Sequence, residues 1–169
     1  VRSEEHLTRD AQSQLADLRA ALDNLGSACS QAAGELAAST VVHSALRRGG
    51  GDSRTLYQVL FRCAQPLAEY VRFDVYDRDG FCRYTTAGGL PDEFLDPDWG
   101  VLRAAREAEG VVLRSGAEGG LTAARAVRNY AGTALGYILI TAEQSGLDRL
   151  FSGLYPAASE VLLLDSRWR

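Results

Sequence analysis

Residues 1–47 carry apolar and small side chains at intervals that alternate between three and four positions. The stripe consists of Leu15, Leu18, Leu22, Leu25, Cys29, Ala32 and Leu36, continued by Val42 and Leu46. This heptad spacing predicts a single amphipathic helix. At 1.5 Å per residue such a helix would be about 70 Å long, more than a small domain can cover. We expect part of it to project or to pair with a second chain; the alternative is a plain core helix.

A second helix follows a break in the pattern. Three glycines at 49–51 end the first stripe, and Asp52 or Ser53 can cap the next helix. Apolar residues on one face predict this helix over 54–70, and Pro66 should kink it or end it early.

Beyond residue 70 the apolar period changes to two, which is the period of a strand. We expect strands over 71–76 and 81–86, joined by a turn that contains an Asp-Gly pair. The other expected elements are a loop over 87–100, helices over 101–109 and 145–155, and strands over 111–114, 121–129, 134–141 and 160–165. This order predicts an α+β fold, in which the long N-terminal helix and the second helix pack on a five-stranded antiparallel sheet.

Composition narrows the function classes. Apolar residues make up 46% of the chain, which is enough for a packed core. The net charge is −4 and all 18 basic residues are scattered arginines, so we expect no binding to nucleic acid. The three cysteines, Cys29, Cys63 and Cys82, form no C-x-x-C pair, and the only histidines are His6 and His43. We therefore expect no metal site.

Catalytic motifs are missing from the sequence. It contains no G-x-S-x-G elbow, P-loop, H-E-x-x-H or G-x-G-x-x-G. We expect neither an enzyme nor a bound cofactor. No stretch approaches the roughly 18 apolar residues that a membrane span needs. Because the chain starts at Val1 and has no methionine, we expect a piece of a longer protein.

Several strings, in this order, resemble the extracytoplasmic Cache (PAS-like, PDC) sensor domains of bacterial transmembrane receptors such as sensor histidine kinases and chemoreceptors. They are Phe73-Asp74-Val75-Tyr76-Asp77-Arg78-Asp79-Gly80, Tyr84-Thr85-Thr86, Asp98-Trp99-Gly100-Val101-Leu102, Ala124-Arg125-Ala126-Val127-Arg128 and Leu135-Gly136-Tyr137-Ile138-Leu139-Ile140. The resemblance covers roughly residues 55–155. It implies a membrane-anchored receptor in which a small molecule binds above the sheet and signals to a kinase, chemotaxis or cyclase module.

The resemblance also implies a division of the chain. Residues 1–47 would be a stalk and dimerisation helix, 48–156 the sensor domain, and 157–169 a strand that opens a second Cache domain. One departure concerns the ligand, because Trp99 is followed by glycine where amino-acid receptors of this family have an aromatic residue. Amino-acid sensing is therefore not supported.

A ligand pocket in this fold would lie between the sheet, the 101–109 helix and the 87–100 loop. The candidate ligand-binding residues are Tyr84, Thr86, Trp99, Arg103, Arg125 and Tyr130. Arg125 alternates with Ala123 and Val127, so all three should share one strand face. A buried arginine needs a partner, which would be either a ligand carboxylate or an internal Asp or Glu.

We therefore expect an extracytoplasmic small-molecule-sensing domain that binds a ligand such as a carboxylate and forms a homodimer through its N-terminal helix. Two alternatives remain open. One is a structural and dimerisation module with no ligand of its own, which internal pairing of Arg125 would favour. The other is a cytoplasmic PAS or GAF-type regulatory domain, which three unpaired cysteines would favour.

Overall fold

The computed structural model describes residues 2–48, 53–88, 93–115 and 120–154. Its centre is one antiparallel sheet with strand order β2-β1-β5-β4-β3. The strands are β1 (Arg72–Asp77), β2 (Cys82–Thr85), β3 (Val112–Ser115), β4 (Leu121–Arg128) and β5 (Ala134–Ala142). The helices are α1 (Arg2–Ala38), α2 (Thr40–Arg48), α3 (Ser53–Ala64), α4 (Gly100–Glu107) and α5 (Gln144–Leu154), with a 3-10 turn η1 (Gln65–Leu67). The predicted α+β fold with five antiparallel strands is confirmed.

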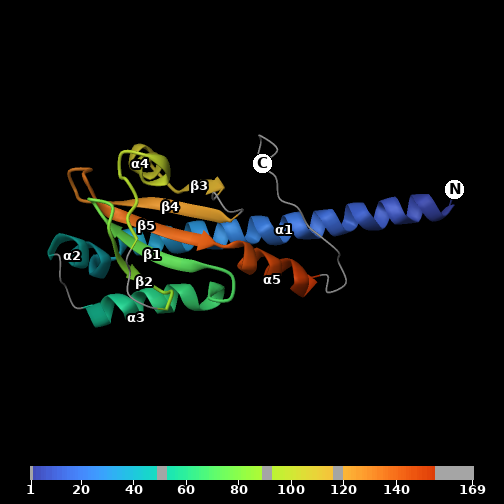
Figure 1. Ribbon diagram of the computed structural model, residues 1–169, viewed down its shortest axis with the longest axis horizontal. Coiled ribbons are helices and arrows are strands. Elements are labelled where there is room, and N and C mark those ends of the chain that lie inside the picture. The colour runs from blue at the N-terminus through green and yellow to red at the C-terminus, as the bar shows by residue number, and fades with distance from the viewer. Residues whose placement is uncertain (1, 49–52, 89–92, 116–119, 155–169) are drawn as a thin grey trace.

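Helices cover both faces of the sheet (Figure 1). One face packs on α1, α2, α3 and α5 through Phe73, Val75, Ile138 and Ile140. The other face packs on α4 through Tyr76, Cys82, Ala124, Ala126, Tyr137 and Leu139. The two sets alternate along β1, β4 and β5, because successive side chains point to opposite faces.

The N-terminal helix is broken where one continuous helix over 1–47 was expected. Helix α1 ends at Ala38 and α2 begins at Thr40. Ser39 is the N-cap of α2, since its carbonyl accepts the first helical hydrogen bond from the backbone N–H of His43 at 3.1 Å. The ring Nε2 of His43 donates to the free carbonyl of Ala37 at 2.7 Å. Serine is favoured at such a cap.

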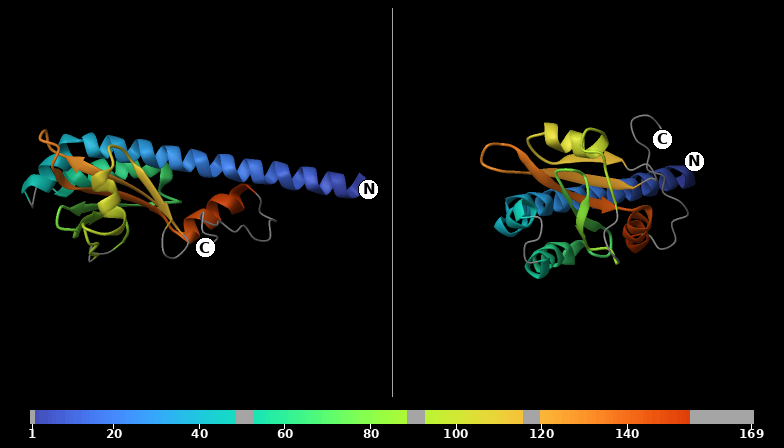
Figure 2. Two further views of the ribbon diagram at one scale, coloured as in Figure 1. Left: turned by 90° about the horizontal axis from the view of Figure 1, so that it is seen from above. Right: turned by 60° about the vertical axis from the view of Figure 1, so that its left-hand side comes forward.

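Helix α1 extends well beyond the sheet (Figures 1 and 2). Its first buried residue is Leu25, whereas Leu15 on the same stripe is 64% exposed. Leu18 and Leu22 lie between them and are partly buried against the core. The apolar stripe therefore continues outside the domain body, as its length predicted.

Other predicted elements are observed with ends that differ by a few residues. The second helix stops at Ala64, and the chain then makes the turn η1 around Pro66. The predicted strand over 160–165, like the whole segment 157–169, lies outside the described residues.

Candidate functional site

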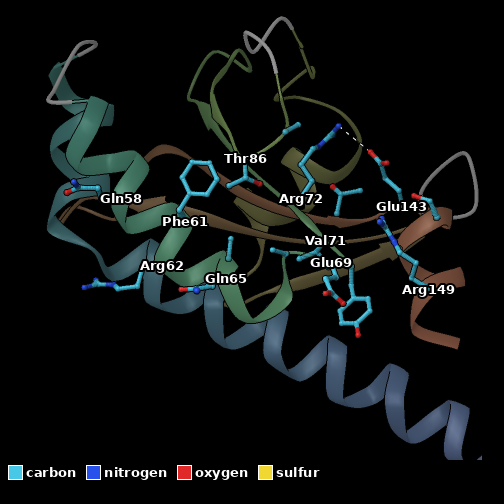
Figure 3. Close-up of a pocket in the computed structure, with 17 residues that line it drawn as sticks. Gln58, Phe61, Arg62, Gln65, Glu69, Val71, Arg72, Thr86, Glu143 and Arg149 are labelled. Carbon is cyan, nitrogen blue, oxygen red and sulfur yellow. Dashed lines mark hydrogen bonds and ion pairs between the residues drawn. The ribbon is translucent and has the colours of Figure 1, made fainter. Parts of the chain in front are cut away.

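A cavity of about 720 Å³ lies between α3 with η1 on one side and the start of α5 on the other (Figure 3). We call it the α3–α5 cavity. Its floor is formed by the start of β1, the residues that follow β2 and the end of β5. Small-molecule sites in proteins typically occupy about 300–1,000 Å³, so the volume suits a metabolite.

Close packing of α5 onto the start of β1 forms one wall of this cavity. Gly146, near the start of α5, lies directly over the backbone of Tyr70: an added Cβ would be 2.1 Å from the Tyr70 carbonyl oxygen. Only glycine permits this approach. The neighbours of Gly146 on α5, Ser145 and Arg149, consequently face the cavity.

Apolar and charged groups lie at different parts of the α3–α5 cavity. Phe61 projects from α3 beside Thr86, while Arg72, Glu143 and Arg149 gather toward α5 (Figure 3). Among the described residues no carboxylate lies within ion-pair distance of Arg149. An apolar wall next to charged groups is the usual arrangement of a site for a small polar ligand.

Arg72 is the centre of a cluster of three carboxylates. Its Nε lies 2.8 Å from Asp74 Oδ2, and its terminal nitrogens lie 3.4 Å from Glu93 Oε2 and 3.4 Å from Glu143 Oε1. Asp74 is 2% exposed, whereas the glutamates are half exposed. Arg72 therefore connects the cavity to a buried carboxylate beneath it.

Opposing effects act on the pKa of the buried Asp74 carboxylate. Burial raises its pKa, while hydrogen bonds from Thr85 and Arg72 and the positive charge of Arg72 lower it, and the net result is a raised pKa. For Arg72, burial lowers the pKa and its three carboxylate neighbours raise it, with a net increase. Arg72 therefore stays charged and compensates for part of the cost of burying Asp74.

The face toward α4, where the ligand pocket was expected, is filled by buried side chains. Tyr76 and Tyr137 are each 1% exposed and pack with Leu102, Ala105 and their neighbours. Burial raises the pKa of both tyrosines, and it also raises the pKa of Cys82 to about 12. These groups stay neutral near pH 7 and act as core residues.

The six residues predicted to bind ligand are not brought together. Thr86 lines the α3–α5 cavity, and its Oγ1 accepts a hydrogen bond from the N–H of Phe73. Arg125 and Tyr130 line a different pocket, beside α1 and α2. The other three lie away from both: Tyr84 is in the core against Tyr57, Trp99 is 75% exposed before α4, and Arg103 pairs with Glu107.

Within the described part of the chain, no group of acidic, histidine or cysteine side chains is arranged to hold a metal ion. The three cysteines are free thiols, and burial raises the pKa of Cys29 to about 11. In that same part, no helix combines the length and apolarity needed to cross a membrane.

The chain is similar in structure to a consistent class of solved proteins, whereas the sequence comparisons found no match. No protein-family model matches the chain, and no curated protein matches it. Among solved structures, the sensor domain of the V. cholerae histidine kinase DctB superposes with a TM-score of 0.61 at 15% identity over 88% of this chain. An extracellular domain assigned to the histidine kinase vpHK1S-Z8 gives 0.64 at 14% identity over 89%. The E. coli DcuS sensor domain gives 0.57 at 17% identity over 78%.

These neighbours define the fold class. The chain has the fold of the PAS-like sensor domains of receptors, a class in which histidine kinases recur. It spans 60% and 64% of the first two structures, but 98% of the DcuS sensor domain.

Sequence reasoning missed most of the residues around the α3–α5 cavity. Arg72 and Asp74 stand two positions apart in β1, on either side of the apolar Phe73, so they share one face. That spacing was the available signal for a buried ion pair. No local pattern connects them to Arg149, which lies far along the chain and is brought close only by the packing of α5.

Proposed function

We propose that the chain is an extracytoplasmic, small-molecule-sensing domain of a membrane-bound receptor, and that its ligand occupies the α3–α5 cavity. The observation that supports this most is the cavity of about 720 Å³ between two helical walls in a chain with the sensor-domain fold. The alternative of a structural module without a ligand draws support from the filled face toward α4.

The lining of the cavity favours a small carboxylate with a short apolar part. Arg149 can pair with a carboxylate, since no acidic partner of its own lies within ion-pair distance among the described residues. The Thr86 hydroxyl, which accepts from Phe73, retains its proton to donate to a ligand oxygen. Phe61, 54% exposed, offers apolar surface to the remainder of the molecule.

A screen of small carboxylates should identify compounds that raise the melting temperature of the purified chain. A ligand at 100 times its dissociation constant adds about 2.7 kcal/mol to the free energy of unfolding. The Arg149→Gln variant should lose most of this effect, because glutamine cannot form the charged pair. Arg78→Gln is the matched control, since Arg78 is exposed in the β1–β2 turn, away from the cavity. No stabilisation by any compound, or equal stabilisation of both variants, would contradict the proposal.

The walls of the cavity offer a route for the signal. Helix α5 supplies one wall, and its buried residues Leu147 and Phe151 pack in the same core as α1. A ligand that draws α5 toward α3 would favour a different position of α5 against α1. We propose that ligand binding shifts the population between these positions.

We also propose that the domain forms a homodimer through the exposed part of α1. Leu15 continues the apolar stripe beyond the domain body, where an intermolecular contact would bury it.

Leu15→Glu should weaken the dimer by about tenfold or more in sedimentation equilibrium, because burying a leucine contributes about 1.5–3 kcal/mol and each tenfold corresponds to 1.4 kcal/mol. Ser13→Glu adds the same charge at an exposed position off the stripe and should leave association unchanged. Association that is insensitive to Leu15→Glu would place the interface elsewhere.

A further inference from the structure

A second pocket, of about 530 Å³, shares no lining residue with the α3–α5 cavity and lies where α1 breaks into α2. We call it the α1–α2 pocket. Strand β3 pairs with β4 only as far as Ala124, so in the described part of the chain the edge of β4 that faces away from β5 has no partner strand beyond that point. The rest of β4 and the segment after α4 form the other wall.

Arg125 points into this pocket on the α1 side of the sheet. Its Nη1 lies against Gly34 of α1, where an added Cβ would be only 3.3 Å away. It shares that face with buried Ala123 and Val127, as the alternation predicted. No carboxylate among the described residues lies within ion-pair distance of Arg125. Its half-buried charge therefore has no protein counter-charge there.

Arg128 adds a second positive charge at the same place. Its guanidinium donates to the backbone carbonyls of Arg106, Ala108 and Gly132. These neutral acceptors hold the side chain in position but leave its charge uncompensated. The pocket lining contains three arginines, with Arg47 as the third, and one acidic residue, Glu109, so its formal charge is +2.

We infer that the α1–α2 pocket is a binding site for a small oxyanion, such as a phosphate or a dicarboxylate, separate from the proposed ligand cavity. Uncompensated guanidinium groups in a concave site are what such anions require. A bound oxyanion would contact α1 and α2 on one side and β4 on the other. The oxyanion would thereby bridge the region around the helix break at Ser39 and the sheet.

The direct test is titration of the full chain with inorganic phosphate and, separately, with succinate at constant ionic strength, because screening weakens exposed charge pairs. Saturable binding by isothermal calorimetry is expected for at least one of the two. Arg125→Gln should weaken it about tenfold or more, as a charged hydrogen-bonded pair implies. Arg78→Gln removes the same charge from the exposed β1–β2 turn and should have no effect.

Gly34→Ala provides a test that a general loss of stability cannot imitate. Alanine favours the helix, and the flexible Arg125 end can move away, so the melting temperature without anion should stay the same or rise. Anion affinity should nevertheless fall, because the guanidinium is displaced. Gly26→Ala is the matched control on α1, where an added Cβ meets nothing within 4 Å, and should leave affinity unchanged.

Each outcome decides the inference. If neither anion binds, or if Arg125→Gln does not weaken the binding, the proposed anion site is overturned. The site is also separable from the α3–α5 cavity, since Arg149→Gln should leave phosphate binding intact. If that variant abolished phosphate binding, the anion would belong to the other cavity and the inference would be wrong.

Discussion

Replacing Arg72 with alanine should lower the free energy of unfolding by about 3 kcal/mol near neutral pH, because it leaves the carboxylate of Asp74 buried without its counter-charge. Asp74 is 2% exposed and lies 2.8 Å from the guanidinium. Arg83→Ala is the matched control. Arg83, whose side chain is 57% exposed, pairs with Asp77, and without Arg83 the Asp77 carboxylate keeps its hydrogen bonds from the backbone N–H groups of Asp79 and Phe81. The loss should therefore stay below about 1 kcal/mol. Urea unfolding of the two variants measures the difference.

The deficit of Arg72→Ala should shrink in acid. Burial already raises the pKa of Asp74, and removing Arg72 removes two contributions that lower it, so the pKa rises further. A carboxyl group whose pKa is higher in the folded state than in the unfolded state stabilises the fold at pH values below the unfolded pKa. This stabilisation is lost as the pH rises through the folded pKa. The variant should therefore regain part of its lost stability between about pH 7 and pH 4.5.

Two results would contradict this account of the pair. A deficit that stayed constant or grew in acid would show that removing Arg72 does not raise the pKa of Asp74 in the folded state. The double variant Arg72→Ala/Asp74→Asn removes both charges and should be more stable than Arg72→Ala alone at neutral pH. If the double variant is not more stable, the stability lost in Arg72→Ala comes from the lost packing of the aliphatic part of the arginine side chain.

Gly146→Ala should cost about 3 kcal/mol, because its methyl group would overlap backbone atoms that cannot move independently. The added Cβ would lie 2.1 Å from the Tyr70 carbonyl oxygen and 2.9 Å from its carbon. Helix α5 would have to move away from the start of β1. Ligand affinity in the α3–α5 cavity should fall with it, since Ser145 and Arg149 move as well.

Gly153→Ala is the matched control for this prediction, since it lies in the same helix and an added Cβ there meets nothing within 4 Å. This variant should gain up to about 1 kcal/mol, because alanine has the higher helix propensity. Thermal or urea unfolding distinguishes a loss at one position from a gain at the other. Equal effects at both positions would show that helix propensity, and not the contact with Tyr70, sets the stability.

Local patterns were sufficient for the elements but not for the site. The period of two located β1, β4 and β5 because each strand has a fully packed face, and the alternation correctly grouped Arg125 with Ala123 and Val127. Both faces of this sheet are covered, however, so alternation cannot say which face meets α1 and which meets α4. Arg125 was assigned to the α4 side for that reason and lies on the other. The α3–α5 cavity is formed by long-range packing of α5 on Tyr70, for which a single sequence holds no periodic signal.

The N-terminal part of α1 projects beyond the core, so a small rotation of the helix within the domain becomes a larger displacement at its far end. Residues 2–17 precede the first contacts of the helix with the core and span about 24 Å at 1.5 Å per residue. A rotation of α1 by about 5° within the domain would move the far end of this segment by roughly 2 Å, comparable to helix shifts that switch other proteins. Small rearrangements in the core would thus be amplified into larger displacements at the far end of α1.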